Sequence, residues 1–231
     1  MIYAIGDVHG EAEALERLIE RLPVQQTDLV VFLGDLINRM GKDPFRCVEA
    51  VLGFDRCRKV CLHGNHEDSF REYLEHGDPS VLTGMSAETT LESYESAGYP
   101  VTPGDPMSIP EAHARFYFSA EPWTLPFYIT DDYIFTHAGW NLDRPIERQN
   151  LYQMHWGQVT GADKPVWNQT VVRGHSPVSK VTQVPAKQFI GVDTGCGMGG
   201  ALSAFALPSE EIFTEFPASY RKRWRSRLAS P

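Results

Sequence analysis

The stretch IYAIGDVHG at residues 2–10 joins a short apolar run to a polar cluster of glycine, aspartate and histidine. The arrangement recurs along the chain, and the later clusters are Gly34-Asp35, Gly64-Asn65-His66-Glu67, His137-Ala138-Gly139 and Gly174-His175. Short runs that are rich in β-branched residues and end at glycine are typical of buried strands. Because open α/β sheets build their sites at the carboxyl ends of strands, we expect these polar side chains to converge.

The first part of the chain alternates predicted strands and helices. Leu15, Leu18 and Leu22 lie on one helical face before Pro23, and further helices are expected at about 44–52 and from about Glu67. This β-α-β-α-β order predicts parallel strands with right-handed crossovers. The later part predicts strands joined by short turns, which favours antiparallel pairing; they are 126–130, 133–137, 170–174, 188–193, 201–207 and 211–216.

Residues 77–122 interrupt this rhythm with six prolines and two predicted helices, near 86–97 and 110–119. The segment is short and has no evident core of its own, so we interpret it as a helical cap over the site. The 231 residues then form a single domain, 1–231. A basic tail at about 217–231 includes the run RKRWRSR at residues 221–227 and is expected to be solvated.

Composition excludes several classes of protein. The net charge of −9 gives no basic face for general nucleic-acid binding, and no run approaches the length that spans a bilayer. The first strand starts at residue 2, which leaves no room for a signal peptide. Four cysteines without a second pair at zinc-site spacing predict buried free thiols. We therefore expect a cytoplasmic protein with no nucleic-acid or membrane partner, of open oligomeric state.

The polar clusters together predict a centre of two divalent metal ions. Asp7 and His9 are two residues apart and point the same way after a strand, and a carboxylate with an imidazole suits Mn, Fe or Zn. Asp35 would bridge this ion to a second ion. A lone Gly-Asp turn or a lone buried histidine is more often structural, but five clusters in order at strand ends favour the metal site. The expected ligands are Asp7, His9 and Asp35 for one ion, and Asp35, Asn65, His137 and His175 for the other.

These motifs resemble the calcineurin-like metallophosphoesterase superfamily, and within it the bacterial members of the phosphoprotein phosphatase (PPP) branch, the serine/threonine phosphatases. The resemblance rests on the five clusters and on the segment Val192-Asp193-Thr194-Gly195, and it runs from residue 2 to about 207. It implies an α/β fold: a four-layer α/β/β/α sandwich of two mixed sheets with flanking helices and the dimetal site between the sheets. Mn is the first expectation for both ions, with Fe, Zn, Ni and Co as alternatives.

The resemblance also implies roles in binding and catalysis. His66 would be the general acid that protonates the leaving group, and Arg39 would bind phosphate oxygens beside Asn65. Asn38 stands where this branch usually has an aspartate that charges the acid histidine, so the pKa of His66 should be lower than with aspartate. The second phosphate-binding arginine of the branch is missing near His155. Arg144, Arg148, Lys164 and Arg173 are the candidates to take its place.

The remaining histidines are expected to have structural roles: His63 would support the site, and His76 and His113 would lie on surface helices. The function expected first is a phosphomonoesterase that uses a metal-bridging hydroxide for in-line attack on phosphorus. Phosphoserine or phosphothreonine in a protein is the first substrate expected, ahead of another small phosphoester. One alternative is a dinucleoside-tetraphosphate hydrolase similar to the symmetrical diadenosine tetraphosphatases. The other alternative is a low-activity metal-binding scaffold.

Overall fold

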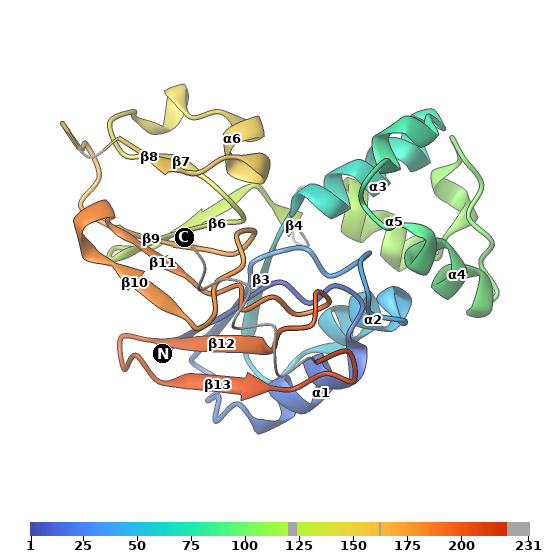
Figure 1. Ribbon diagram of the computed structural model, residues 1–231, viewed down its shortest axis with the longest axis horizontal. Coiled ribbons are helices and arrows are strands. Elements are labelled where there is room, and N and C mark those ends of the chain that lie inside the picture. Colours follow the sequence, from blue (N-terminus) through green and yellow to red (C-terminus); the bar gives the residue numbers. More distant parts are fainter. Residues whose placement is uncertain (120–123, 162, 221–231) are drawn as a thin grey trace.

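The computed structural model describes residues 1–119, 124–161 and 163–220 (Figure 1). The helices are α1 Ala12–Arg21, α2 Pro44–Gly53, α3 Asn65–His76, α4 Glu88–Ser96, α5 Glu111–Phe118 and α6 Leu151–Trp156. The strands are β1 Ile2–Ile5, β2 Leu29–Phe32, β3 Arg58–Leu62, β4 Thr124–Leu125, β5 Phe127–Ile129, β6 Tyr133–Thr136, β7 Trp140–Asn141, β8 Val159–Thr160, β9 Thr170–Arg173, β10 Thr182–Val184, β11 Phe189–Gly191, β12 Leu202–Leu207 and β13 Ile212–Glu215.

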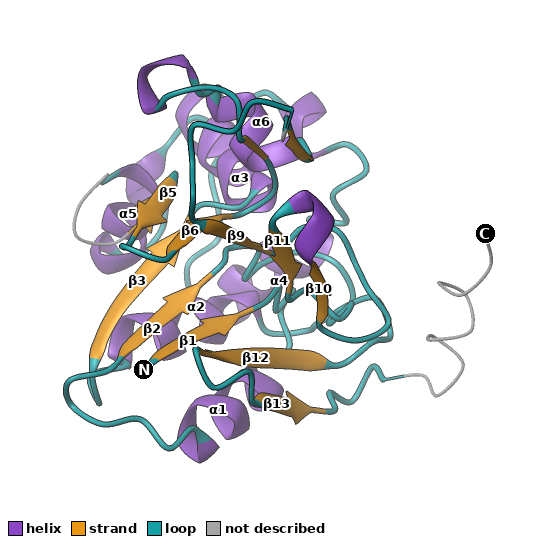
Figure 2. Ribbon diagram, turned by 90° about the vertical axis from the view of Figure 1, so that its left-hand side faces the viewer, coloured by secondary structure: helices purple, strands orange, loops and turns teal. Residues whose placement is uncertain are grey.

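Two mixed sheets form the centre of the fold. One has the order β13-β12-β1-β2-β3-β4 and the other β10-β11-β9-β6-β5, while β7 and β8 pair separately. β1, β2 and β3 are parallel, as the alternating order predicts, and β1 lies between β12 and β2 (Figure 2). The two sheets flanked by helices confirm the predicted α/β fold class.

Hydrophobic packing explains the layers. Residues of β1 and β2 such as Ala4 and Val31 pack towards Phe135 and Val172 of the second sheet. The opposite face of the first sheet packs on α1 and α2, whose buried face includes Leu18. Since β2 is covered on both faces, its run Leu29–Phe32 is apolar throughout and wholly buried. The outer face of the second sheet packs on Trp140 and Met154, from β7 and α6.

The prediction of antiparallel pairing in the later part is wrong for two of its pairs. β6 pairs with β9, and β9 with β11, in parallel, whereas β5–β6, β10–β11 and β12–β13 are antiparallel. Parallel neighbours need a long crossover, and the segment 137–169 between β6 and β9 supplies one that contains α6. The order of the apolar runs in the sequence did not reveal that this segment brings the chain back so that β9 runs in the same direction as β6.

Helices α3, α4 and α5 group at the right of Figure 1, away from α6. α4 and α5 lie within the predicted cap segment, and the interpretation of that segment as a cap stays a prediction. The four cysteines are free and buried, as expected. Among the described helices, none combines the length and the hydropathy that crossing a bilayer requires. The basic run at 221–227 lies outside the described residues.

Candidate metal centre

The side chains expected to bind metal converge where the strands of both sheets end. They are Asp7 and His9 after β1, Asp35 after β2, Asn65 after β3, His137 after β6 and His175 after β9. Five of them are at most 4% exposed, and His175 is half-buried. Residues up to 168 positions apart therefore face one another, as in the contact between the backbone N–H of His175 and the Asp7 carboxylate at 3.1 Å.

The Asp35 carboxylate lies at the centre of this cluster. Its Oδ2 is 3.7 Å from His9 Nε2, 3.8 Å from His66 Nε2 and 3.4 Å from His137 Nε2. Two ligand atoms that are each about 2.1 Å from one cation lie roughly 3.0–3.4 Å apart at tetrahedral or smaller angles. The distances from Asp35 Oδ2 to the histidine nitrogens are therefore close to the separation of two ligand atoms on one cation. Asp35 belongs to two groups of possible donors, one with His9 and His66 and one with His137 and His175.

The two donor groups differ from the expected division in one respect. His66, expected as a general acid, joins His9 and Asp35 in the tight group, whereas Asp7 Oδ2 is 3.9 Å from His9 Nε2 and lies outside it. The second group also includes the Asn65 side chain, whose Oδ1 is 3.0 Å from His137 Nε2 and 2.9 Å from His175 Nδ1. The division of the ligands between two ions stays a prediction.

Backbone carbonyls orient two of the histidines. His9 Nδ1 is 2.9 Å from the Ile37 carbonyl, and His137 Nδ1 is 2.8 Å from the Leu33 carbonyl. In both rings Nδ1 must be the donor, so a neutral ring presents an Nε2 lone pair to the cluster. The His137 lone pair then faces the Asn65 oxygen, and two facing acceptors need a positive charge between them. The donor set therefore fits divalent cations.

The electrostatics of the cluster point in the same direction. Asp7, Asp35 and Asp193 are each 2% exposed. Burial, followed by the charge of Asp193, raises the pKa of Asp7 well above its usual value. For His137, burial acts to lower the pKa, but the charges of Asp35 and Asp7 dominate and raise it to about 10, so without a metal ion a proton on Nε2 supplies the positive charge that a bound cation would replace. A buried site with this much negative charge is stabilised by bound cations.

Backbone strain concentrates at the same place. His9, Asp35, Asn38, Arg39 and His175 all have φ between 52° and 69°, a left-handed conformation that is uncommon outside glycine. Such conformations persist only where surrounding contacts hold them, and they cluster at functional sites. Here the contacts include hydrogen bonds from the N–H groups of Val8 and His9 to the Asp35 carbonyl, at 3.0 and 2.9 Å.

Glu67 is a residue of this site to which the sequence assigned no role. Its carboxylate is wholly buried and accepts hydrogen bonds from the backbone N–H groups of Asp35 and Leu36 at 2.7 Å and of Gly64 at 3.0 Å. Glu67 thus ties the loop after β2 to the loop after β3, which carry Asp35 and Asn65. The only signal in the sequence was its position at the end of the run Gly64-Asn65-His66-Glu67.

Asn38 contacts His66, and α4 fixes the orientation of the Asn38 amide. Thr90 accepts the backbone N–H of Asn38 at 3.0 Å and donates its hydroxyl to Asn38 Oδ1 at 2.5 Å. The amide nitrogen of Asn38 then lies 2.9 Å from His66 Nδ1 and donates to it. Burial is the main cause that lowers the pKa of His66 to about 3, and the negative charge of Asp35 partly opposes it. A neutral His66 in this arrangement carries its proton on Nε2, towards the cluster.

The backbone of Arg39 is held by Ser86, which precedes α4, and by Thr89 in the first turn of α4. Its backbone N–H donates to the Ser86 carbonyl at 3.2 Å, and its carbonyl accepts the Thr89 hydroxyl at 3.3 Å. The buried Nε of Arg39 has no hydrogen-bond partner among the described residues. Arg173, one of the candidates to replace the missing arginine, is 6% exposed, and its guanidinium carbon lies 4.8 Å from the centre of the Phe189 ring.

The other histidines are placed as follows. His63 Nε2 and His155 Nε2 are buried without a hydrogen-bond partner in the described part of the chain, and His155 Nδ1 is 3.6 Å from Asp68 Oδ2. His76 is exposed, as expected. The prediction for His113 is wrong: it is fully buried on α5, where its Nδ1 is 2.7 Å from the Tyr94 hydroxyl, because α5 turns this face towards α4.

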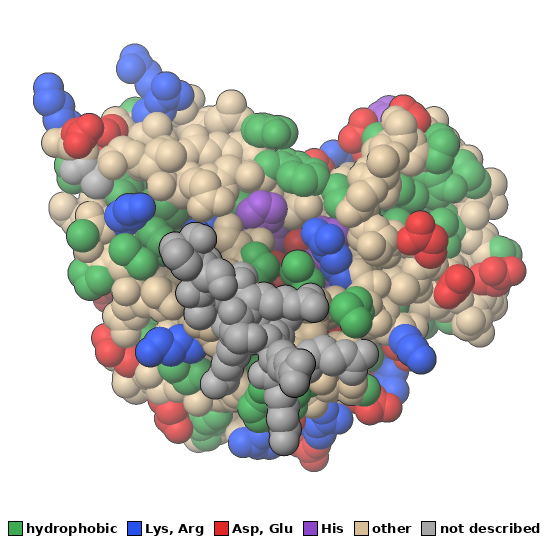
Figure 3. Space-filling view, viewed as in Figure 1, with side chains coloured by type: hydrophobic (Ala, Val, Ile, Leu, Met, Phe, Trp, Pro, Cys, Tyr) green, Lys and Arg blue, Asp and Glu red, His purple; other side chains and the backbone are tan. Residues whose placement is uncertain are grey.

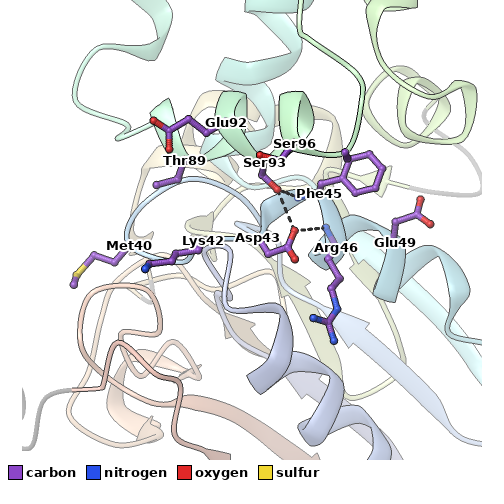
Figure 4. Close-up of a pocket in the computed structure, with 11 residues that line it drawn as sticks. Met40, Lys42, Asp43, Phe45, Arg46, Glu49, Thr89, Glu92, Ser93 and Ser96 are labelled. Carbon is purple, nitrogen blue, oxygen red and sulfur yellow. Dashed lines mark hydrogen bonds between the residues drawn. The ribbon is translucent and has the colours of Figure 1, made fainter.

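A cavity of about 920 Å³ lies away from the metal centre, between α2 and α4 (Figure 4). Three of its polar residues bond to one another, since Asp43 Oδ1 accepts both the backbone N–H of Arg46 at 3.3 Å and the Ser93 hydroxyl at 3.1 Å. The Asp43 contact to Arg46 caps α2, so this cavity has a structural explanation. The converging donors at the strand ends remain the better candidate for chemistry.

Comparison with known proteins agrees with this geometry. A sequence model described as Calcineurin-like phosphoesterase matches residues 1–199. Relatives from Bacillus velezensis (26% identical; 90% of this chain, 89% of the relative) and Geobacillus sp. (27% identical; 91% of each) are both named bis(5'-nucleosyl)-tetraphosphatase PrpE, asymmetrical. A crystal structure provisionally described as a diadenosine tetraphosphatase superposes with a TM-score of 0.64 at 23% identity, covering 94% of this chain and 93% of the other. That structure shows the shared fold.

Proposed function

This chain belongs to the calcineurin-like phosphoesterase family and is a metal-dependent phosphoric ester hydrolase, and from that premise we propose that it cleaves dinucleoside tetraphosphates asymmetrically. The observation that carries the proposal is the agreement in name of relatives that align over about nine-tenths of both chains. This favours the nucleotide alternative over the protein phosphatase expected first. The sequence alternative was a symmetrical cleavage, which gives two nucleoside diphosphates. The names of the relatives favour an asymmetrical cleavage, which gives two unequal products.

In the proposed reaction, water adds across one P–O–P bond of the four-phosphate chain and releases a nucleoside monophosphate and a nucleoside triphosphate. The family depends on two metal ions, and when bound they lower the pKa of water and neutralise charge on the phosphoryl oxygens. Six residues would hold them, namely Asp7, His9, Asp35, Asn65, His137 and His175. Support comes from the two donor groups that share Asp35 and from the histidine rings that present lone pairs.

The proposed roles of the remaining residues follow from their contacts. His66 Nε2 carries a proton towards the cluster, so it would donate a hydrogen bond to the oxygen of the departing phosphate and stabilise the charge that develops there. Asn38 would position that ring rather than charge it. Arg39, whose guanidinium has an unpartnered buried Nε among the described residues, would bind phosphate oxygens in the fork geometry that suits them.

The test compares substrates with purified protein and added Mn²⁺. Diadenosine tetraphosphate, a phosphothreonine peptide and para-nitrophenyl phosphate are assayed side by side, and nucleotide products are separated by ion-exchange chromatography. We expect the dinucleotide to have the highest kcat/KM and to give AMP and ATP in equal amounts. Formation of ADP alone would restore the symmetrical reaction, and preferred cleavage of the peptide would restore the protein phosphatase. Binding of two metals with no cleavage of any substrate would favour the scaffold.

A further inference from the structure

Helix α6 presents two aromatic rings to solvent beside the metal centre. Tyr152 is 71% exposed and Trp156 is 38% exposed, and their rings lie 6.5 Å apart at an interplanar angle of 17°. The two residues are four apart, so they share one face of the helix. The face towards the sheet is made instead by Met154 and His155, which are 2% and 8% exposed. Tyr152 is therefore not needed to pack α6 onto the fold, and more than a third of the Trp156 side chain also faces solvent.

The pair lies next to the candidate metal ligands. The Trp156 ring is 6.3 Å from the His175 ring at 77°, and His175 Nδ1 is 3.2 Å from His137 Nε2. Figure 3 shows apolar side chains over α6 at the rim of a hollow in which histidine and basic side chains are visible. An exposed aromatic surface at the edge of a polar cleft is typical of a binding site. Its occupant must reach the metal centre with its phosphate and the rings with an apolar part.

A nucleoside phosphate has both parts, because its phosphate and its planar base are joined through a single sugar. Every nucleobase offers a planar π-face, and stacking on tyrosine or tryptophan is a sequence-tolerant way to bind it. The chain carries a net charge of −9, so long-range attraction does not favour a substrate that is itself a polyanion. Uncharged contacts such as stacking would then add to the affinity that the metal ions and Arg39 supply at the phosphate.

We infer that Tyr152 and Trp156 form a platform on which one base of the dinucleoside polyphosphate stacks while its phosphate chain enters the metal centre. This inference rests on the proposed function, because it names the contact by which the same site would recognise a nucleotide. It assigns to α6 the choice of a nucleoside substrate over a phosphate chain without a base. The aromatic platform consists of Tyr152 and Trp156 alone.

The experiment measures the preference for a base in Tyr152→Ala and Trp156→Leu. For each protein, kcat/KM is determined for diadenosine tetraphosphate and for inorganic tripolyphosphate, which has no base, and the ratio of the two is compared with wild type. Loss of one stacking contact should lower this ratio by roughly 5- to 100-fold, mainly through KM for the dinucleotide. Tyr99→Ala is the matched control, because Tyr99 is 41% exposed and stacks on Phe45 of α2, far along the chain from α6.

Titration with AMP gives a readout that does not depend on turnover. AMP should quench tryptophan fluorescence in wild type and in Tyr99→Ala, and much less in Trp156→Leu. Tyr152 is mostly exposed, so Tyr152→Ala should fold even if Trp156→Leu does not. The proposed base platform is contradicted if both variants keep the wild-type ratio of kcat/KM for diadenosine tetraphosphate to kcat/KM for tripolyphosphate. It is also contradicted if the variants lose activity only towards a phosphothreonine peptide. Wild-type protein that cleaves tripolyphosphate but not the dinucleotide would instead overturn the proposed function.

Discussion

Replacing Glu67 with glutamine is expected to weaken the fold and the metal centre together. The carboxylate accepts three backbone hydrogen bonds, from Leu36 on Oε1 and from Asp35 and Gly64 on Oε2. Glutamine has nearly the same shape but only one acceptor oxygen, and its amide nitrogen is a donor. In the better orientation, the amide oxygen keeps the bonds from Asp35 and Gly64, and the NH₂ group faces the N–H of Leu36.

The cost follows from this count. One hydrogen bond to a charged group is lost and one buried N–H is left unpaired, which costs about 1–3 kcal/mol. The two bonds that remain become neutral rather than charge-assisted, so we expect a total loss of about 3 kcal/mol in the free energy of unfolding. For a chain of this size that corresponds to a fall in Tm of roughly 6–12 °C. Displacing the loops of Asp35 and Asn65 should also lower kcat by about 10- to 100-fold.

The assay is thermal unfolding at pH 8, followed by circular dichroism. At this pH Glu67 is ionised, although burial and the Asp35 charge raise its pKa to about 7. Glu72→Gln is the control, because it makes the same chemical change at an exposed position of the same helix and should shift stability by less than about 0.5 kcal/mol. If Glu67→Gln melts within 2 °C of the control, taken as roughly the noise of such a comparison, and keeps its kcat, Glu67 does not hold the two loops.

Three further changes test the site. Asp35→Asn keeps the left-handed backbone, which asparagine tolerates, but should abolish retention of Mn²⁺ after dialysis, measured by elemental analysis; retention of two ions would remove Asp35 as the shared ligand. Asn38→Asp should raise the pKa of His66, measured by NMR titration of its ring protons, and an unchanged pKa would show that residue 38 does not tune this ring. The contacts with His155 and Arg71 hold the pKa of Asp68 below its usual value in the folded chain. Its stabilising contribution is therefore present above the unfolded pKa near 3.9 and is lost as the pH falls through the folded value, so Tm between about pH 5 and pH 2 should fall more in wild type than in Asp68→Asn.

The site residues that sequence could locate are those that follow a strand directly. Asp7, Asp35 and His137 each come one to three residues after a buried apolar run, and the run fixes where the chain leaves the sheet. Strand ends of neighbouring parallel strands meet at one edge, so local pattern was enough to predict that such side chains converge. The same reasoning failed for β6 and β9, because pairing direction depends on how the 33 intervening residues return the chain.

Residues whose role arises from contact between distant segments could not be found in this way. The sequence indicates that Asn38 lacks the charge of an aspartate, but it does not indicate which way the amide points. That depends on Thr90, 52 residues later, whose hydroxyl holds Asn38 Oδ1 and so turns the amide N–H₂ towards His66. A donor at that position selects the neutral ring with its proton on Nε2, whereas an aspartate would accept from Nδ1 and favour the charged ring. The effect of asparagine at position 38 is thus set by α4, which lies outside the motif. Thr90→Val should allow the Asn38 amide to turn and should partly reproduce the rise in the His66 pKa expected for Asn38→Asp.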